Sequence, residues 1–224
     1  MIFLLTPRLE LIKNQVQGDF IADIGTDHGF VPIELIKSGK CKGAIASDIN
    51  IGPAEIAKSN IKKEGLSIQV RVGSGLSVLK KGEAEEIIIA GMGGKLISDI
   101  IAADMDIAKN ARLILQPMNA QYELRKFLTE NKFFVEHEDL ALEGFKVYNV
   151  IVCTSKENNS VKYHSELDYH IPYVLKSHSH FKHLKEKKIR EFSKILKGYK
   201  LSKIPVEQEK ITYLENLLSE IKNL

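Results

Sequence analysis

The chain has few cysteines and no apolar run long enough to cross a bilayer. Its two cysteines, Cys41 and Cys153, lie far apart, and neither has a second cysteine or a histidine at metal-ligand spacing. This argues against a zinc site or a disulfide framework, and it predicts two reduced cysteines with Cys153 in a core. The first residues, MIFLLTPRLE, lack a basic region and a long apolar stretch, so we expect a cytoplasmic protein without membrane segments.

A large net charge is also missing, but the charges are unevenly distributed. The whole chain carries +3 at neutral pH. Residues 156–224 hold 14 Lys and Arg against 9 Asp and Glu, so this segment carries +5 and residues 1–155 carry −2. A basic segment joined to a nearly neutral domain favours a polyanionic partner.

The hydrophobic pattern predicts a doubly wound α/β domain over residues 1–155. Short β-rich runs alternate with helical stretches, which is typical of a parallel sheet covered by helices on both faces. The runs predicted as parallel strands are 20–24, 43–49, 68–72, 86–91 and 111–117. Residues 133–154 contain two further β-like runs around EGFK without a helix between them, which predicts an antiparallel hairpin at the sheet edge.

Residues 156–224 show a helical pattern without strands. The polar stretch SKENNS at 155–160 is the best linker candidate, and KLSKIP at 200–205 interrupts the helical pattern. Apolar residues recur at helical spacing on both sides of that break, which predicts a helical hairpin with a coiled-coil-like seam. The seam residues are Phe181, Leu184, Phe192, Ile195, Tyr199, Ile211, Leu214, Leu218 and Ile221.

Five of the seven histidines also lie in this helical segment: His164, His170, His178, His180 and His183. No two of them form a clear i, i+4 ligand pair supported by acids. The pattern therefore favours solvated or RNA-facing side chains over a metal site.

The stretch FIADIGTDHGFVPIEL, residues 20–35, places an acidic and glycine-containing turn between a strand and a helix. Its order is acid-x-Gly-x-Asp-x-Gly, whereas a dinucleotide fingerprint reads G-x-G-x-x-G. Asp23 and Asp27 would repel a pyrophosphate, but their charges suit the sulfonium and ammonium groups of S-adenosylmethionine. Asp48 follows the second strand, where an acid commonly accepts hydrogen bonds from ribose hydroxyls. The pattern favours a methyltransferase over a dehydrogenase.

Four motifs make the resemblance specific. The sequence resembles the TrmK family of bacterial tRNA (adenine-22-N1)-methyltransferases from about Arg8 to Thr154, with looser agreement in the helical segment. The shared motifs are DIGTDHGFVP at 23–32, DINIGP at 48–53, GMGGKLI at 91–97 and LILQP at 113–117. Two positions depart from the family pattern, since Phe30 stands where Tyr is frequent and Met118 where Asn is common.

The resemblance implies a class I methyltransferase fold, S-adenosylmethionine as cofactor, tRNA as partner, no metal, and methylation of N1 of adenine 22. It implies that Asp23, Gly25 and Thr26 surround the methionine part of the cofactor, with Asp23 near its ammonium group. Asp48 would accept from the ribose hydroxyls. The remaining residues expected at the cofactor are Ile49, Asn50, Gly73, Ser74, Gly75, Ala90, Gly91, Met92 and Gly93, of which Gly73 to Gly75 would lie beside the adenine.

Asp27 and His28 are the residues expected at the reacting centre. Methylation of adenine N1 uses a ring lone pair, so alignment of N1, methyl carbon and sulfur can supply most of the catalysis. A carboxylate could stabilise the cationic product or take a proton from the N6 amine, and an imidazole could orient the base. The residues expected to contact the RNA substrate are Gly94, Gln116, Pro117, Lys188 and Arg190.

Two other functions fit parts of the pattern. A small-molecule methyltransferase could use the helical segment as a lid or a dimer arm. A non-catalytic nucleotide- or RNA-binding protein could share the fold, although the polar or glycine-rich residues after every strand argue against it.

Overall fold

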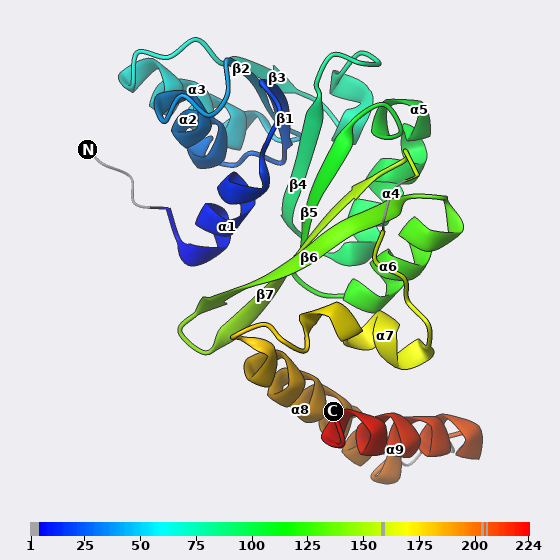
Figure 1. Cartoon of the computed structure of the whole chain (residues 1–224). Coiled ribbons are helices and arrows are strands. Elements are labelled where there is room, and N and C mark those ends of the chain that lie inside the picture. The colour runs from blue at the N-terminus through cyan, green and yellow to red at the C-terminus, as the bar shows by residue number, and fades with distance from the viewer. Residues whose placement is uncertain (1–4, 158–159, 203, 205) are drawn as a thin grey trace.

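The computed structural model describes residues 5–157, 160–202, 204 and 206–224 (Figure 1). Seven strands form one sheet in the order β3-β2-β1-β4-β5-β7-β6. Strands β1 to β5 are parallel, β7 runs antiparallel to β5, and β6 pairs with β7 at the edge. The strands are β1 (Phe20–Ile24), β2 (Gly43–Asp48), β3 (Gln69–Val72), β4 (Glu86–Met92), β5 (Arg112–Pro117), β6 (Phe134–Glu143) and β7 (Lys146–Thr154). The predicted sheet and edge hairpin are confirmed.

Helices cover both faces of this sheet. On one face lie α1 (Pro7–Gln15), α2 (Phe30–Lys37) and α3 (Ile51–Lys63), which share a buried cluster with the strands. On the other lie η1 (Gly75–Val78), α4 (Gly94–Ala103), α5 (Met105–Ala108) and α6 (Gln121–Glu130), around a second cluster. Figure 1 shows the two helical layers on opposite sides of the strands. The doubly wound arrangement brings the carboxyl ends of β1 to β5 to one edge of the sheet.

The C-terminal part contains α7 (Glu166–His170), η2 (Tyr173–Leu175), α8 (Phe181–Lys200) and α9 (Gln208–Lys222). Helices α8 and α9 pack together through Leu184, Leu214 and Leu218, as the predicted hairpin requires. The seam is narrower than predicted, because Ile195 is 40% exposed. Residues 158–159 of the expected linker and residues 203 and 205 of the expected break lie outside the described residues.

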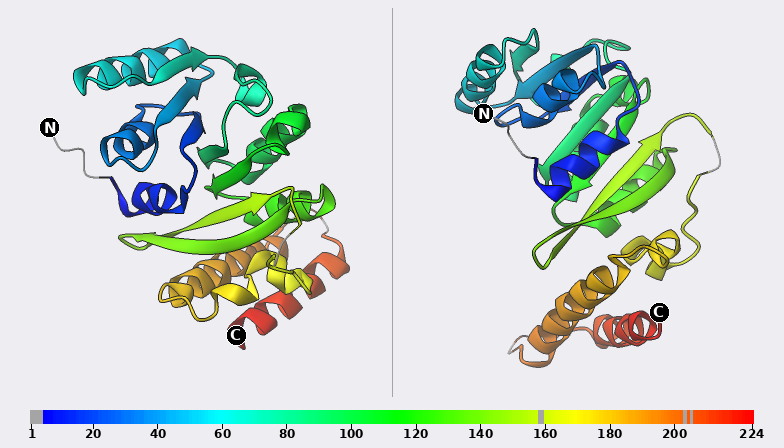
Figure 2. Two further views of the ribbon diagram at one scale, coloured as in Figure 1. Left: turned by 45° about the horizontal axis from the view of Figure 1, so that its top comes forward. Right: turned by 60° about the vertical axis from the view of Figure 1, so that its left-hand side comes forward.

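The helical hairpin also packs against the sheet. Leu140 of β6 and Val147 of β7 belong to the same buried cluster as Leu184 and Leu218. Helix α8 contacts β7 and the short η2 contacts β6, and Figure 2 shows the helical hairpin on this side of the β6–β7 ribbon. This apolar contact joins the two parts, and the division into domains at residue 155 remains a prediction.

A buried ion pair strengthens the same junction. Arg125 of α6 donates two hydrogen bonds to Glu138 of β6, at 2.8 and 2.7 Å, and a third to the Tyr169 carbonyl at 2.8 Å. The Tyr163 hydroxyl also donates to Glu138, at 2.6 Å. Arg125 and Glu138 are both buried, so the paired geometry and its extra hydrogen bonds offset the cost of removing two charges from water.

Both cysteines are free and buried, and Cys153 lies in the main core as predicted. In the part of the chain that the structure describes, no helix is long and apolar enough to cross a membrane.

Candidate cofactor and substrate site

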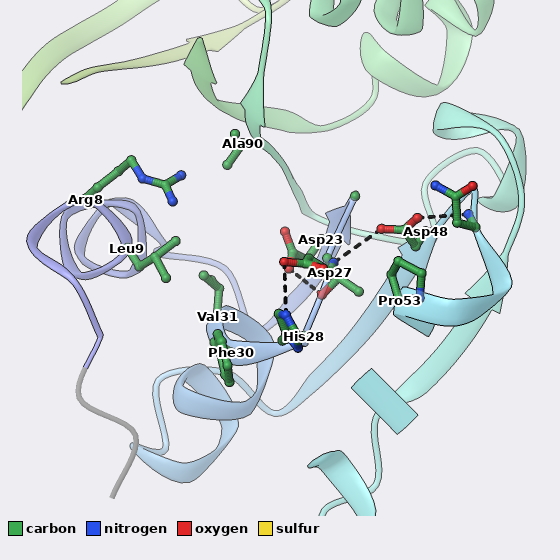
Figure 3. Close-up of a pocket in the computed structure, with 14 residues that line it drawn as sticks. Arg8, Leu9, Asp23, Asp27, His28, Phe30, Val31, Asp48, Pro53 and Ala90 are labelled. Atoms are coloured by element: carbon green, nitrogen blue, oxygen red, sulfur yellow. Dashed lines mark hydrogen bonds and ion pairs between the residues drawn. The ribbon is translucent and has the colours of Figure 1, made fainter. Parts of the chain in front are cut away.

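Two adjoining cavities lie at the carboxyl ends of β1 to β4. The first, of about 540 Å³, is called the acidic cavity here because Asp23, Asp27 and Asp48 line it (Figure 3). The second, of about 300 Å³, is called the apolar cavity because Ile24, Ile49, Met92, Leu96 and Ile100 line it. The residues that line both are Gly25, Asp48, Asn50, Ala90 and Gly91. A ligand could therefore extend from one cavity into the other past Asp48.

Asp23 is the buried acid at the end of β1. It is 5% exposed, and the Thr26 hydroxyl donates to its carboxylate at 2.7 Å. Burial raises the pKa of Asp23 to about 6, with a smaller upward contribution from the Asp48 charge and a downward one from the Thr26 hydrogen bond. The carboxylate lacks a cationic partner among the described side chains, so a bound cation would stabilise its ionised form.

The turn after β1 has a backbone that only a small residue permits. Gly25 has φ +74°, and a Cβ there would lie 2.1 Å from the Met92 methyl group. The amides of Gly25 and Thr26 both donate to the Ser47 carbonyl at 2.8 Å, which fixes the turn to the end of β2. This geometry leaves room for a ligand to lie against the backbone of the turn.

Asp48 is oriented by backbone amides. The Asn50 amide donates to one carboxylate oxygen at 2.9 Å and the Asp27 amide to the other at 3.4 Å. Asp48 is 9% exposed but lines both cavities, so its remaining acceptor positions can reach a ligand. A fixed carboxylate between two cavities is suited to accept from a pair of adjacent hydroxyls.

Asp27 and His28 lie on the more open side of the acidic cavity. The Asp27 carboxylate is 3.4 Å from His28 Nε2, and these side chains are 67% and 40% exposed. Asp27 has a left-handed backbone, φ 52°, and the His28 ring stacks on Phe30 at 5.2 Å between centroids. Figure 3 shows Asp27 between His28 and Asp48. The pair is accessible to a substrate that enters from solvent.

The apolar cavity is lined by glycine-rich backbone and by exposed aliphatic side chains. Gly73, Ser74 and Gly75 form the wall after β3, and Ile49, which lines the same cavity, is 63% exposed. A planar heteroaromatic ring would remove the Ile49 and Leu96 side chains from water.

Six predicted site residues do not line either cavity: Lys188 and Arg190 of α8, and Gly93, Gly94, Gln116 and Pro117 near the ends of β4 and β5. Gln116 is fully buried, and its side-chain carbonyl accepts from Arg8 Nη1 at 2.8 Å and from the Gly91 amide at 3.2 Å. A Cβ on Gly94 would lie 2.3 Å from the Ala120 carbonyl oxygen, so Gly94 permits close packing of α4. The expected contact of Gly93 with the cofactor, and those of Gly94, Gln116 and Pro117 with the substrate, remain predictions.

The two predicted RNA contacts on α8 differ in exposure. The Arg190 side chain is 66% exposed, as expected of a residue that faces solvent. Lys188 is 6% exposed, and its ammonium lies 3.0 Å from Glu191. Burial lowers the pKa of Lys188. The RNA contact expected of Lys188 does not fit this burial, because Lys188 follows Leu184 and precedes Phe192 at four-residue intervals on the packed face of the helix.

The histidines of the helical segment also differ in how exposed they are and in the partners they contact. His170 is 9% exposed and stacks on Tyr122, so the expectation of a solvated or RNA-facing side chain was wrong at this position. Burial lowers its pKa to about 4. His178 pairs with Asp139 at 2.8 Å. Among the described residues, no group of three or more His, Cys, Asp or Glu side chains could hold a metal ion.

Sequence reasoning missed Arg8 and the helix that carries it. Arg8 lines the acidic cavity from α1, a helix that the strand-helix pattern did not include. A local signal was present, because Thr6 caps the helix by accepting from the Leu9 amide, and Pro7 occupies its first turn.

Comparisons with known proteins agree with this geometry. A family model described as a methyltransferase domain matches residues 5–151. The tRNA (adenine(22)-N(1))-methyltransferase of Bacillus subtilis strain 168 is 39% identical over 160 residues, which are 70% of this chain and 67% of that protein. The crystal structure of the B. subtilis m1A22 tRNA methyltransferase TrmK has a TM-score of 0.86 and 31% identity, and the match covers 98% of this chain and 99% of that one.

A Streptococcus pneumoniae structure in complex with S-adenosyl-L-methionine has a TM-score of 0.84 and 31% identity, with 98% of this chain and 99% of that chain covered. Fold, acidic turn and comparisons together define an S-adenosylmethionine-dependent methyltransferase of class I. Within that class, the chain belongs to the TrmK family.

Proposed function

We propose that this protein transfers a methyl group from S-adenosylmethionine to N1 of adenine 22 in tRNA. The observation that carries the proposal is the acidic turn of Asp23, Gly25 and Asp27 beside the fixed Asp48, in a chain of the TrmK family. The B. subtilis relative carries this activity in its name, and the S. pneumoniae relative binds the cofactor.

The two cavities suggest how the cofactor lies. Its adenine fits the apolar cavity against Ile49 and the Gly73–Gly75 wall, and its ribose hydroxyls donate to Asp48. The methionine part then enters the acidic cavity, where the buried Asp23 carboxylate favours a cation. In this arrangement the sulfonium would lie near Gly25 and Gly91, two of the residues that line both cavities.

The transfer needs alignment more than acid–base chemistry. The lone pair of adenine N1 attacks the methyl carbon as the carbon–sulfur bond breaks, which leaves S-adenosylhomocysteine and a cationic adenine. Asp27 is close enough to the open side of the cavity to stabilise that positive charge, and His28 with Phe30 offers a flat surface for the incoming base. A proton that leaves the N6 amine of the adenine can pass to solvent through Asp27 and His28.

The helical hairpin is proposed as the tRNA-contacting part, with residues 1–155 as the methyltransferase domain. Several cationic side chains of α8 are exposed, including Lys182, Arg190, Lys194 and Lys197. Lysines and arginines that neutralise phosphates release counterions, which favours binding to a large folded RNA. A small-molecule methyltransferase would gain nothing from this exposed basic surface.

Incubation of the full chain with S-adenosylmethionine and unmodified tRNA, followed by nucleoside mass spectrometry, tests the proposal. We expect 1-methyladenosine. Methylation of small nucleosides but not of tRNA would contradict the proposal, and so would cofactor binding without turnover on any tRNA.

A further inference from the structure

The β6–β7 hairpin reaches past the strand to which it is attached. Pairing of β7 with β5 ends at Leu115 and Ile151, whereas pairing of β7 with β6 continues for five more residue pairs to Glu143 and Lys146. At about 3.3 Å per residue, the hairpin extends roughly 16 Å beyond the last pair of β7 with β5. Strand β6 is parallel to β5, because both are antiparallel to β7. The hairpin turn therefore lies at the carboxyl edge of the sheet, as the acidic cavity does.

The turn at the end of this hairpin carries an exposed aromatic residue. Phe145 is 82% exposed, the highest fraction among the large hydrophobic residues that the structure describes as exposed. Gly144 supplies the left-handed backbone of the turn, with φ +59°, and Lys146 on the other side is exposed. A single apolar side chain on a surface needs no special explanation, so the position of Phe145 decides whether it has a role. Here the ring is presented at the tip of a projecting hairpin, next to a cation.

Two sets of contacts place the hairpin end near both the acidic cavity and α8. Arg8, which lines the cavity, donates its backbone amide to Glu143 at 2.9 Å, and its guanidinium lies 5.6 Å from the centroid of the Tyr148 ring. The Lys187 ammonium of α8 donates to the Val147 carbonyl at 3.3 Å. Figure 2 shows the hairpin turn between α1 and the start of α8. An RNA that places one nucleotide in the cavity and its backbone on the exposed cations of α8 therefore passes the hairpin end.

The proposed reaction needs a base that has left its stack. N1 of adenine lies on the edge that pairs within a folded RNA, so the nucleotide has to turn out before N1 can reach the methyl group. The gap that remains exposes the faces of the neighbouring bases. An aromatic side chain can fill such a gap and stack on those faces, whatever the bases are. Phe145 offers a flat ring without any hydrogen-bonding atom in its side chain.

We infer that Phe145 is a positioning residue that enters the gap left by the target adenine and stacks on a neighbouring base. The inference rests on the proposed function, and it adds how the folded RNA is held open while the adenine is methylated. It also gives the length of the β6–β7 hairpin a role, since the hairpin carries the ring beyond the end of β5.

Three single variants of the full chain test this inference: Phe145→Ala, Phe145→Trp, which keeps a flat ring, and Ile56→Ala. Ile56 of α3 is 43% exposed and lines neither cavity, so it is a matched control for the loss of an exposed apolar side chain. Single-turnover methylation of an unmodified tRNA transcript is measured at saturating cofactor and enzyme.

Two further measurements separate stacking from other effects. Extrusion of the base is followed on the same tRNA with 2-aminopurine in place of adenine 22 and S-adenosylhomocysteine in place of the cofactor, because 2-aminopurine becomes more fluorescent when it leaves the stack. Calorimetry gives the affinity for S-adenosylmethionine. Thermal unfolding of each variant without ligand confirms that it is folded.

We expect Phe145→Ala to lower the methylation rate by about tenfold or more and to reduce the rise in 2-aminopurine fluorescence, because a stack between base and aromatic ring is lost. Its affinity for S-adenosylmethionine should change by less than about twofold, since the ring lies outside the cofactor site. Phe145→Trp should stay within about threefold of the parent in both RNA assays, because it can still stack. Ile56→Ala should match the parent.

A parental rate and a parental fluorescence rise in Phe145→Ala would overturn the inference, and would leave the exposed ring to a protein partner or to a second copy of the chain. An equal loss in Phe145→Ala and Phe145→Trp, or weaker cofactor binding in either, would also overturn it, because stacking would not explain the effect. A parent protein that binds the cofactor but methylates no tRNA would instead overturn the proposed function, so the two failures can be told apart.

Discussion

Asp23 shows how a single buried carboxyl can make both stability and binding depend on pH. Its pKa is raised from 3.8 to about 6 in the folded protein, mainly by burial. The unfolded chain therefore binds fewer protons than the folded chain between these two values, so Asp23 lowers the stability of the cofactor-free protein as pH rises through about 6.

We therefore expect Asp23→Asn to raise the free energy of unfolding of the cofactor-free protein at pH 7.5, by roughly 1–3 kcal/mol, and to have little effect near pH 4. The affinity of the parent for S-adenosylmethionine should fall as pH drops below about 6, because the carboxylate becomes protonated. Denaturant unfolding and calorimetry across this range measure both. Glu55→Gln, at a side chain that is 64% exposed, is the control. Identical pH dependence in the parent and Asp23→Asn would contradict this account.

Asp48 has a narrower role, as acceptor for the ribose hydroxyls. Its carboxylate is already oriented by the Asn50 and Asp27 amides, so its loss should affect the ligand more than the fold. Asp48→Ala should weaken binding of S-adenosylmethionine by about 1.5–3 kcal/mol, as expected for a charge-assisted hydrogen bond. Calorimetry on the folded variant is the measurement, and unchanged affinity would remove Asp48 from the site.

Asp27 and His28 should affect the chemical step rather than cofactor binding. Both line the acidic cavity, and both side chains are exposed to solvent, unlike that of the buried Asp23. Asp27→Asn and His28→Ala should lower the single-turnover methylation rate by roughly 10–100-fold at saturating cofactor, with little change in cofactor affinity. Parental rates in both variants would exclude these side chains from catalysis.

Among the structural elements, α8 gives the sharpest contrast between two neighbouring cations. Arg190 is on the exposed face of the helix, whereas Lys188 lies among buried residues and pairs with Glu191. We expect Arg190→Glu to weaken tRNA binding and to reduce the slope of log affinity against log salt by about 1, if one phosphate contact is lost. Lys188→Met should leave that slope unchanged. A flatter slope in Lys188→Met alone would reverse the assignment.

The strands and the C-terminal helical hairpin could be predicted because each carries a local signal that agrees with its packing. The run FIADI is apolar and is followed by a glycine-containing turn, and it forms β1 as predicted. Local sequence signals did not predict elements whose position depends on contacts between distant parts of the chain. Helix α1 is short and weakly amphipathic, and it is placed by contacts such as Arg8 with Gln116, which are 108 residues apart.

The position of the candidate site and its main acidic residues could be predicted from the order of the strands. Polar and glycine residues directly after parallel strands must meet at one edge of the sheet, so the positions of Asp23 and Asp48 followed from the strands alone. The sequence could not show that Gln116 is fully buried and does not line the cavity, since this depends on its hydrogen bonds with Arg8 and the Gly91 amide. Lys188 was predicted to contact RNA because it is positively charged. Its four-residue spacing from Leu184 and Phe192 instead indicates the packed face of α8.

At the scale of the whole molecule, the helical hairpin and the sheet are linked by an apolar cluster and a buried ion pair. Removal of residues 156–224 would expose Leu140 and Val147, which pack against Leu184 and its neighbours. It would also remove Tyr163 and the Tyr169 carbonyl from the Arg125–Glu138 pair. Tests of tRNA recognition therefore belong to the full-length chain with surface substitutions.

The most direct test of the central claim is the position of the methyl group on tRNA. The full chain is incubated with S-adenosylmethionine and two unmodified transcripts of one tRNA, identical except that the second has guanine at position 22. Methylated nucleosides are identified by mass spectrometry and located by primer extension. The account predicts 1-methyladenosine at position 22 of the first transcript and no 1-methyladenosine in the second. Equal methylation of both transcripts, or of neither while the cofactor binds, would contradict it.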